Sequence, residues 1–298
     1  MKPFRLLTVI SVPVLLLSCN DGSEEYDATG SFEATEIIVS SQANGRILTL
    51  NVEEGELLQT GQIVGQIDST QLYLQKMSLL SNARGVRAQQ PDISKQTAAL
   101  QDQIKTLERE KARVERLIAA NAANRKQLDD ITAQIDVLQS KLSAQTSTLR
   151  KSSENISAQS STLEIQVAQL DDQLEKTQIT SPISGTVLNR YAEAGELATM
   201  GTPLFKIAET ATLFLRAYVT NDQLSQIKLN DEVTVRVDDG EGNMKTYKGT
   251  ISWISDKSEF TPKTIQTKNE RANLVYALKI TVPNDGFLKI GMYGEVKF

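Results

Sequence analysis

The longest regular pattern in the chain is a seven-residue repeat of apolar positions in its middle third. A first series of apolar residues at this interval is followed, after a short polar interruption, by a second. The first is Leu72, Leu79, Val86, Ile93, Leu100, Leu107 and Val114, and the second is Leu128, Ile135, Leu142, Leu149, Ile156, Leu163 and Leu170. A sustained heptad keeps apolar side chains on one narrow face of a helix. The pattern predicts an antiparallel coiled-coil α-hairpin over residues 70–177.

Two local signals shape this hairpin. Asn124 is the last residue of the segment AANAAN, precedes RKQLDD and has the position of an N-cap for the second helix. Pro91 lacks an N–H group and disfavours helical backbone at Gln90, so we expect a break in the first helix between residues 89 and 92. Each arm is then about 50 residues long, or roughly 75 Å at the rise of an α-helix.

A second inward row supports the first in each helix, with Ile104 and Ile118 in one and Ile131 and Leu138 in the other. Several positions predicted for this row are polar, so we expect a coiled coil of moderate stability. These positions are Lys111, Gln145, Ser152 and Gln159.

A second kind of pattern, of short apolar runs broken by glycine, occurs once on each side of the predicted hairpin. The segment NGRILTLNVEEGELLQTG at residues 44–61 matches SGTVLNRYAEAGELATMG at residues 184–201 without a gap. Gly45, Gly55 and Gly61 therefore align with their counterparts 140 residues later, which indicates the same tight turns in both copies. Each copy has only about 30 residues, too few to close a core alone. We expect two halves of one β unit, over residues 38–69 and 178–209.

Short β-rich runs separated by turn signals fill the remainder of the chain and predict a small barrel or sandwich. We assign residues 30–37 and 210–298 to this domain and interpret the polar connection Asp256–Arg271 as an exposed loop. The runs are Leu213–Val219, Glu232–Val237, Lys248–Ile254, Leu274–Val282 and Glu295–Phe298.

The N-terminus has the pattern of a targeting segment. Lys2 and Arg5 precede the apolar stretch Leu6–Leu17, which spans about 18 Å as a helix and is short of a roughly 30 Å bilayer core. The sequence LLSC resembles the bacterial lipoprotein signature, which implies a signal peptide at residues 1–18, a lipidated Cys19 and a tether at residues 19–29. The alternative is an ordinary signal peptide that happens to contain a cysteine.

Composition excludes several functions. The 298 residues contain no histidine, which removes histidine-dependent nucleophilic and metal sites. A net charge of −5 and the lack of a basic run with interleaved aromatics argue against nucleic-acid binding. We expect no enzymatic activity, no cofactor and no bound metal.

The order of these parts resembles the HlyD-like periplasmic adaptor, or membrane fusion protein, family of tripartite exporters. The resemblance covers residues 30–298, and its motifs are GSFEATEIIVSSQANGRI, ITSPISGTV and EFTPKTIQTKNER, the last of which is similar to the branch that serves ABC-type exporters. It implies an elongated α+β fold, with a split lipoyl/biotinyl-like domain, an inserted coiled-coil hairpin and a C-terminal β-barrel domain.

The family also implies a motif at the hairpin tip that docks onto an outer-membrane channel. This chain has Arg113 and Leu117 at the first two positions of that motif and Asn124 where serine is expected. The alternative is that Arg113 is only a solvated charge and that Leu117 fills the contact between the helices near the tip.

The function that the resemblance implies is an adaptor in the periplasm of a Gram-negative bacterium, anchored to the inner membrane by the lipid on Cys19. Its implied partners are an inner-membrane ABC-type permease, a TolC-like outer-membrane channel and further copies of itself in a ring, which the resemblance implies to be a hexamer. Two alternatives remain, a lipid-anchored envelope spacer and a lipoyl or biotin carrier. Lys76 and Met77 lie within the predicted helix rather than in a carrier-type EAMKM sequence, which argues against the carrier.

Overall fold

The computed structural model describes residues 26–240, 242–260 and 274–298. The described residues form two compact units, one of those within 26–36 and 208–298 and the other of residues 37–207. The predicted signal peptide, Cys19 and most of the EFTPKTIQTKNER motif lie outside the described residues.

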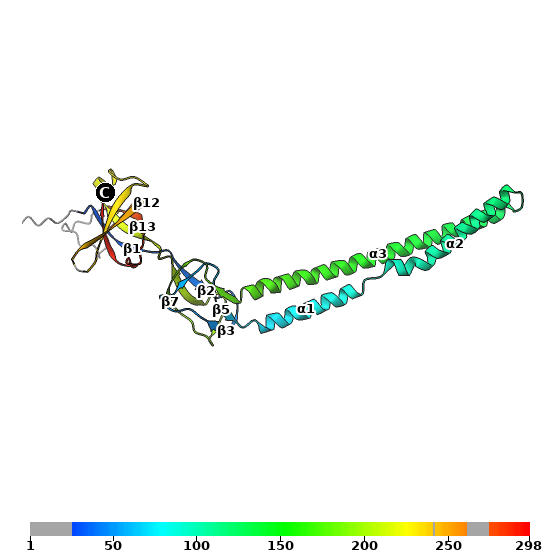
Figure 1. Cartoon of the computed structure of the whole chain (residues 1–298), viewed down its shortest axis with the longest axis horizontal. Coiled ribbons are helices and arrows are strands. Elements are labelled where there is room, and N and C mark those ends of the chain that lie inside the picture. Colours follow the sequence, from blue (N-terminus) through cyan, green and yellow to red (C-terminus); the bar gives the residue numbers. More distant parts are fainter. Residues whose placement is uncertain (1–25, 241, 261–273) are drawn as a thin grey trace, which may run out of the picture. The chain divides into compact units, whose positions relative to one another are not determined.

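The first unit is a closed antiparallel barrel with the strand order β1-β10-β13-β12-β11-β14 (Figure 1). Side chains alternate between the barrel core and solvent, as along β10, because successive residues of a strand point to opposite faces. Phe32, Leu215 and Ile280 are among the fully buried core residues. The strands are β1 (Ala28–Glu33), β10 (Thr212–Val219), β11 (Glu232–Asp238), β12 (Met244–Phe260), β13 (Leu274–Pro283) and β14 (Tyr293–Lys297), and the short helix α4 is Asn221–Leu224.

Two boundaries of this unit differ from the sequence prediction. Strand β1 begins at Ala28, so it includes two residues that we assigned to the tether. Strand β12 continues to Phe260, where the sequence predicted a loop from Asp256 onward. Cross-strand pairing explains the extension, because Glu259 and Phe260 lie opposite the first two residues of β13 beyond two irregularities in register.

The second unit contains two four-stranded sheets, ordered β2-β9-β7-β4 and β6-β5-β3-β8. Each sheet takes two strands from the first repeat copy and two from the second, so neither copy forms a sheet alone. The strands of the first copy are β2 (Glu36–Ser40), β3 (Gly45–Leu50), β4 (Leu57–Leu58) and β5 (Ile63–Ile67), and those of the second are β6 (Gln178–Thr180), β7 (Gly185–Arg190), β8 (Leu197–Ala198) and β9 (Pro203–Ala208).

Matching backbone hydrogen bonds join the two copies. The N–H of Gly55 donates to the carbonyl of Val187 at 2.8 Å, and 140 residues further on the N–H of Gly195 donates to the carbonyl of Ile47 at 2.7 Å. Gly55 and Gly195 have φ values of +89° and +97°, a conformation in which a Cβ atom is strained. The two copies therefore make the same turns within one β unit, as the sequence predicted, and the matching bonds relate them by a local twofold.

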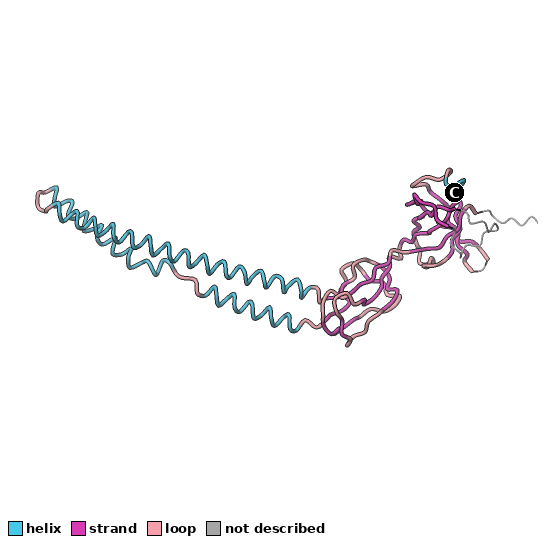
Figure 2. The backbone as a smooth tube through the Cα atoms, turned by 180° about the vertical axis from the view of Figure 1, so that it is seen from behind, coloured by secondary structure: helices cyan, strands magenta, loops and turns pink. Residues whose placement is uncertain are grey.

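The hairpin between the two copies consists of α1 (Thr70–Ala88), α2 (Ile93–Ala119) and α3 (Arg125–Glu175). Figure 2 shows α1 and α2 following one another alongside the continuous α3. The predicted break at Pro91 is confirmed, since α1 ends before it and α2 restarts after it. Asp92 caps the restart, because its side chain accepts a hydrogen bond from the N–H of Lys95 at 3.0 Å.

We call the inward-facing residues of the hairpin the seam. Its second row in α3 differs from the prediction. Residues of both seven-residue series are half-buried or buried, and Lys111 is half-buried. Gln145, Ser152 and Gln159 are exposed instead of inward. Beyond Leu142, the second inward row consists of Thr146, Ser153, Ser160, Val167 and Leu174.

A straight α-helix explains this shift of the seam. It drifts by about 20° per heptad relative to an ideal 3.5-residue repeat. The second inward row of α3 therefore moves from three residues after the first row, as at Ile131, to four residues after it, as at Ser160. Ser160 is only 4% exposed, so a polar residue does lie in this part of the seam, one position beyond the expected Gln159.

The apolar cluster of the seam is confined to the half nearer the turn. Ile104, Val114, Ile131 and Ile135 form its buried part. Along α1, by contrast, the described ion pairs include two that cross to α3, Lys76 with Asp171 at 2.5 Å and Arg87 with Glu164. Within the described ranges no helix is both long enough and apolar enough to cross a membrane.

Candidate docking site at the hairpin tip

Helix α2 ends in a backbone motif that fixes the start of the turn. Asn121 has a φ of +58°, the left-handed region that asparagine tolerates better than most residues. Its N–H donates to the carbonyl of Ile118 at 2.9 Å, and the N–H of Ala122 donates to the carbonyl of Leu117 at 2.8 Å. This pair of bonds is a Schellman motif, which satisfies carbonyl groups that the end of a helix would otherwise leave unpaired.

Helix α3 begins at the N-cap that the sequence predicted. Asn124 has extended backbone, and its Oδ1 accepts a hydrogen bond from the N–H of Lys126 at 3.0 Å. Its carbonyl accepts a second bond from the N–H of Gln127 at 3.1 Å. The loop between the helices, visible at the far end of the hairpin in Figure 2, is therefore held by hydrogen bonds on both sides.

An apolar cluster lies directly beneath this turn. Val114 is fully buried, and Ile118, Ala123 and Leu128 pack against the same cluster as Val114 and Ile131. Because the cluster includes residues from both helices and from the turn, it fixes the tip as one packed structure.

Arg113 lies on the solvent side of α2. Its guanidinium contacts the carboxylate of Glu110, with Nε 2.9 Å from Oε2 and Nη2 2.5 Å from Oε1. The hydrogen bonds from Arg113 lower the pKa of Glu110, and the same bonds raise the pKa of Arg113. The Arg113 side chain is 60% exposed, and an exposed pair of this kind adds little stability, so the guanidinium is presented at the surface.

Leu117 also faces solvent. It is 37% exposed and is not part of the buried cluster beneath the turn, where its neighbour Ile118 packs instead. Leu117 is therefore not among the residues that pack in this cluster. Leu117 follows Arg113 by four residues and shares its face of α2, whereas Asn124 lies in the turn with its Oδ1 engaged by the cap.

Two residues of the tip were not singled out by the sequence analysis. Asn121 forms the Schellman motif, and an asparagine just beyond the last apolar residue of a helix is a known signal for that position. Glu110 pairs with Arg113, and the spacing of three residues between opposite charges is a signal for such a pair on a helix.

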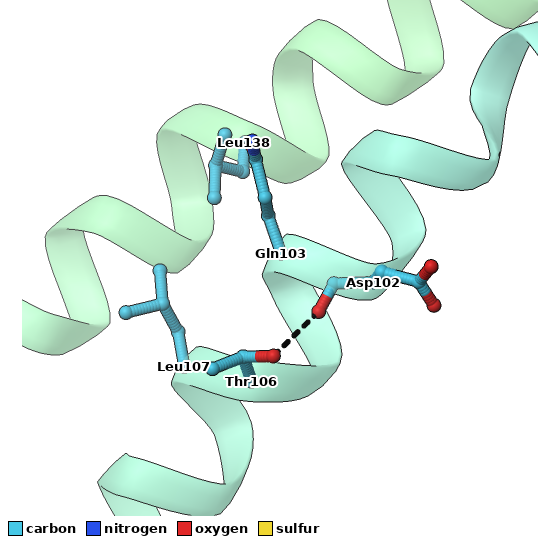
Figure 3. A pocket seen from close by; sticks show the side chains of 5 residues that line it. All are labelled: Asp102, Gln103, Thr106, Leu107 and Leu138. Carbon is cyan, nitrogen blue, oxygen red and sulfur yellow. Dashed lines mark hydrogen bonds between the residues drawn. The ribbon is translucent and has the colours of Figure 1, made fainter.

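An open, shallow pocket lies between α2 and α3 some way from the tip (Figure 3). Leu107 and Leu138 face it from opposite helices, and the Thr106 hydroxyl donates to the Asp102 carbonyl at 2.8 Å within α2. The pocket has no converging charged groups. Among the residues that the structure describes, no group of three or more His, Cys, Asp or Glu side chains is placed to hold a metal ion.

The sequence of this chain matches one family model and is similar to bacterial proteins. The family model described as "RND MFP, barrel-sandwich hybrid domain" matches residues 35–210. A UPF0194 membrane protein of Acidithiobacillus ferridurans is 26% identical over 88% of this chain and 83% of its own length. The UPF0194 membrane protein YbhG of Salmonella arizonae is 29% identical over 94% of this chain and 89% of its own.

Among solved structures, the chain is similar to MacA from Actinobacillus actinomycetemcomitans. The TM-score is 0.53 at 21% identity, and the match covers 91% of this chain and 76% of MacA. A MacA–MexA chimera with the α-hairpin of Pseudomonas aeruginosa MexA gives a TM-score of 0.50 at 21% identity, over 90% and 78% of the two chains. At this level of identity the likeness concerns the fold.

Proposed function

We propose that this chain, which belongs to the membrane fusion protein family, is the periplasmic adaptor subunit of a tripartite exporter. In this proposal it joins an inner-membrane transporter of ABC type to a TolC-like outer-membrane channel. Several copies form a closed ring through head-to-tail contacts, and the resemblance to the family implies six copies. The lipid on Cys19 holds each copy at the inner membrane. The chain supplies contacts and reach, and we assign it no catalytic step.

The observation that carries this proposal is the insertion of the whole hairpin between two halves of one β unit. α1 starts three residues after β5 ends, and α3 ends three residues before β6 begins. Both arms therefore enter the same small unit. Helix α3 has 51 residues, or roughly 75 Å, which gives the tip a long reach from that unit.

The surface proposed to contact the channel is the tip, with Arg113, Leu117 and Asn124. The packed cluster beneath the turn supports this role because it presents Arg113 and Leu117 in a fixed geometry without using either side chain for the seam. A preformed surface loses less conformational entropy when a partner binds.

Crosslinking in cells tests the proposal. Cys19 is the only cysteine in the chain, so an engineered thiol in the mature protein has a single native competitor, which acylation would block. We expect Leu117→Cys to crosslink to an outer-membrane channel protein. Ile165→Cys is the matched control, since Ile165 is another exposed apolar residue of the hairpin and lies far along α3 from the turn.

Two outcomes decide between the adaptor and the envelope spacer. A channel adduct at position 117 but not at position 165, reduced by Arg113→Ala, supports the adaptor. Membrane localisation without any channel adduct, together with normal export in a strain that lacks the gene, contradicts the adaptor and favours the spacer.

The class of transporter is a separate part of the proposal. The sequence motif near Glu259 supports an ABC-type partner, whereas the description of the matching family model names RND systems. Purification of the native complex from membranes, followed by identification of its subunits, distinguishes them. A permease with an ATPase subunit supports the ABC assignment, and an RND pump overturns that assignment while the adaptor role stands.

The carrier alternative has little support from the structure. Lys76 lies on helix α1, where its ammonium group forms an ion pair with Asp171, and not in an exposed β-turn. The intact mass of the mature protein tests this point, because a lipoyl or biotinyl group on a lysine would add a defined increment.

A further inference from the structure

One end of the barrel carries several exposed apolar side chains. Neighbouring barrel strands are antiparallel, so β1, β11 and β13 begin at the same end at which β10, β12 and β14 finish. We call this end the N-terminal rim, because β1 starts there. Its exposed large apolar residues are Tyr26, Leu229, Phe260, Leu274 and Phe298.

These residues come from separate segments that hydrogen bonds and strand pairing bring to the rim. Phe260 and Leu274 are direct cross-strand partners, 74% and 54% exposed. The N–H of Phe298 donates to Oδ2 of Asp27 at 2.9 Å, which holds the end of β14 beside the residue that follows Tyr26. The side chain of Gln223 in α4 donates to the carbonyl of the same Asp27 at 2.5 Å.

Chain connectivity indicates what lies next to this rim. Tyr26 follows Cys19 by seven residues, a segment that spans about 25 Å at most when fully extended. If Cys19 is acylated, as the proposed function requires, the bilayer surface is within that distance of Tyr26. The chain connections Glu33–Glu36 and Ala208–Thr212 both leave the barrel at its opposite end.

We propose that the N-terminal rim inserts its apolar side chains into the surface of the lipid bilayer, as a second membrane contact beside the anchor on Cys19. Aromatic and aliphatic side chains that project together are favoured at the boundary between lipid headgroups and acyl chains. Patches of this kind on soluble domains mark interaction surfaces. This inference rests on the proposed membrane anchor, and it adds a contact that fixes how the barrel faces the membrane.

The charges of the rim indicate that the contact is apolar and not electrostatic. Carboxylates outnumber ammonium groups among the described charged residues on or next to it. They are Asp27, Asp222, Asp231, Glu232 and Glu259 against Lys228, Lys257 and Lys297. The described part of this surface therefore adds no net attraction for anionic lipid.

Vesicle binding by unacylated protein is the first test. The mature chain, residues 19–298, is produced without its signal peptide and mixed with phosphatidylcholine vesicles. We expect Phe260→Ser with Leu274→Ser to lower the partition coefficient by about tenfold for each side chain removed from the contact. Tyr293→Ser is the matched control, since Tyr293 is 65% exposed and lies at the start of β14, at the opposite end of the barrel.

A second test uses the acylated chain in its membrane and does not require independent binding. Trp253 is the only tryptophan, so a Trp253→Phe background leaves one probe per variant. We expect Phe260→Trp to be quenched by brominated lipid and to emit at shorter wavelength than Tyr293→Trp. Positions 253, 260 and 293 are all exposed, so we expect each variant to fold. An unchanged melting temperature checks this.

The outcomes separate this inference from the proposed function. Quenching at position 260 but not at position 293 supports the inference, as does vesicle binding that is weakened by Phe260→Ser with Leu274→Ser and not by Tyr293→Ser. Absence of quenching at position 260 in acylated, membrane-bound protein overturns it and leaves the anchor intact. Crosslinking of position 260 to the transporter without quenching also overturns it, since the rim would then face protein. The channel adduct at Leu117 is measured independently of all these results.

Discussion

Removal of the Asn124 side chain tests whether the N-cap determines the order of the tip. In the structure, Oδ1 of Asn124 accepts the hydrogen bond of the Lys126 N–H at 3.0 Å. An alanine at this position leaves that N–H without its acceptor at the start of α3. Serine keeps a side-chain oxygen that reaches the same donor, so Asn124→Ser is the matched control for Asn124→Ala.

The free-energy cost of Asn124→Ala depends on how exposed Asn124 is. Loss of an N-cap costs about 0.5 to 2 kcal/mol, and because Asn124 is exposed, water replaces part of the lost bond. We therefore expect about 1 kcal/mol, which corresponds to roughly a fivefold increase in the population of the frayed tip. The effect is local, because the apolar cluster around Val114 remains in place.

Hydrogen exchange measured by mass spectrometry is the assay. Peptides that include Lys126 and Gln127 exchange about fivefold faster in Asn124→Ala and near the wild-type rate in Asn124→Ser. Peptides around Leu170, at the far end of α3, keep their rate in both variants. The reasoning fails if serine accelerates exchange as much as alanine, or if alanine has no effect at all.

Three further predictions concern the anchor, the seam and the barrel. Cys19→Ser should abolish incorporation of labelled palmitate, and persistent labelling would refute acylation at this residue. Seven residues inserted into α2 beside Leu107 should displace the apolar rows of α2 relative to those of α3 and abolish export. A second insertion of seven residues into α3 beside Leu138 should restore folding, measured by circular dichroism. The pKa of Asp285 is lowered to about 2, chiefly by a hydrogen bond from Lys245. A lowered carboxyl pKa contributes stability above the unfolded value near 3.9, and that contribution is lost as the pH falls toward 2. The difference in Tm between wild type and Asp285→Asn should therefore be constant from about pH 5 to 8 and shrink below about pH 4. A difference that stays constant down to pH 2 would contradict this assignment.

The large features of the fold were predictable because each has a periodic signal. The seven-residue spacing of Leu128 through Leu170 predicted the long second helix, and the glycines near residues 55 and 195 predicted the paired β copies. Pro91 predicted the interruption between α1 and α2 for a stereochemical reason, the missing N–H group.

The features that the sequence did not predict depend on strand pairing, on the geometry of a long helix and on backbone conformation. The end of β12 contains a polar segment with no strand pattern of its own, and it is extended because Glu259 pairs with Val275. The inward position of Ser160 depends on accumulated drift along a straight helix, which a strict heptad ignores. At the tip, the sequence identified Asn124 but not Asn121, whose role is set by its backbone conformation.

The interruption of one arm opposite an unbroken partner has a mechanical consequence. At the level of Gln90, whose side chain donates to the Ser153 hydroxyl at 2.9 Å, only α3 is a continuous helix. The linker between α1 and α2 lengthens or shortens by rotation of a few backbone dihedrals, while α3 keeps its length and can only curve. Bending in the plane that contains both arms requires one arm to lengthen relative to the other, so the linker lowers the resistance of the hairpin to bending in that plane at this level.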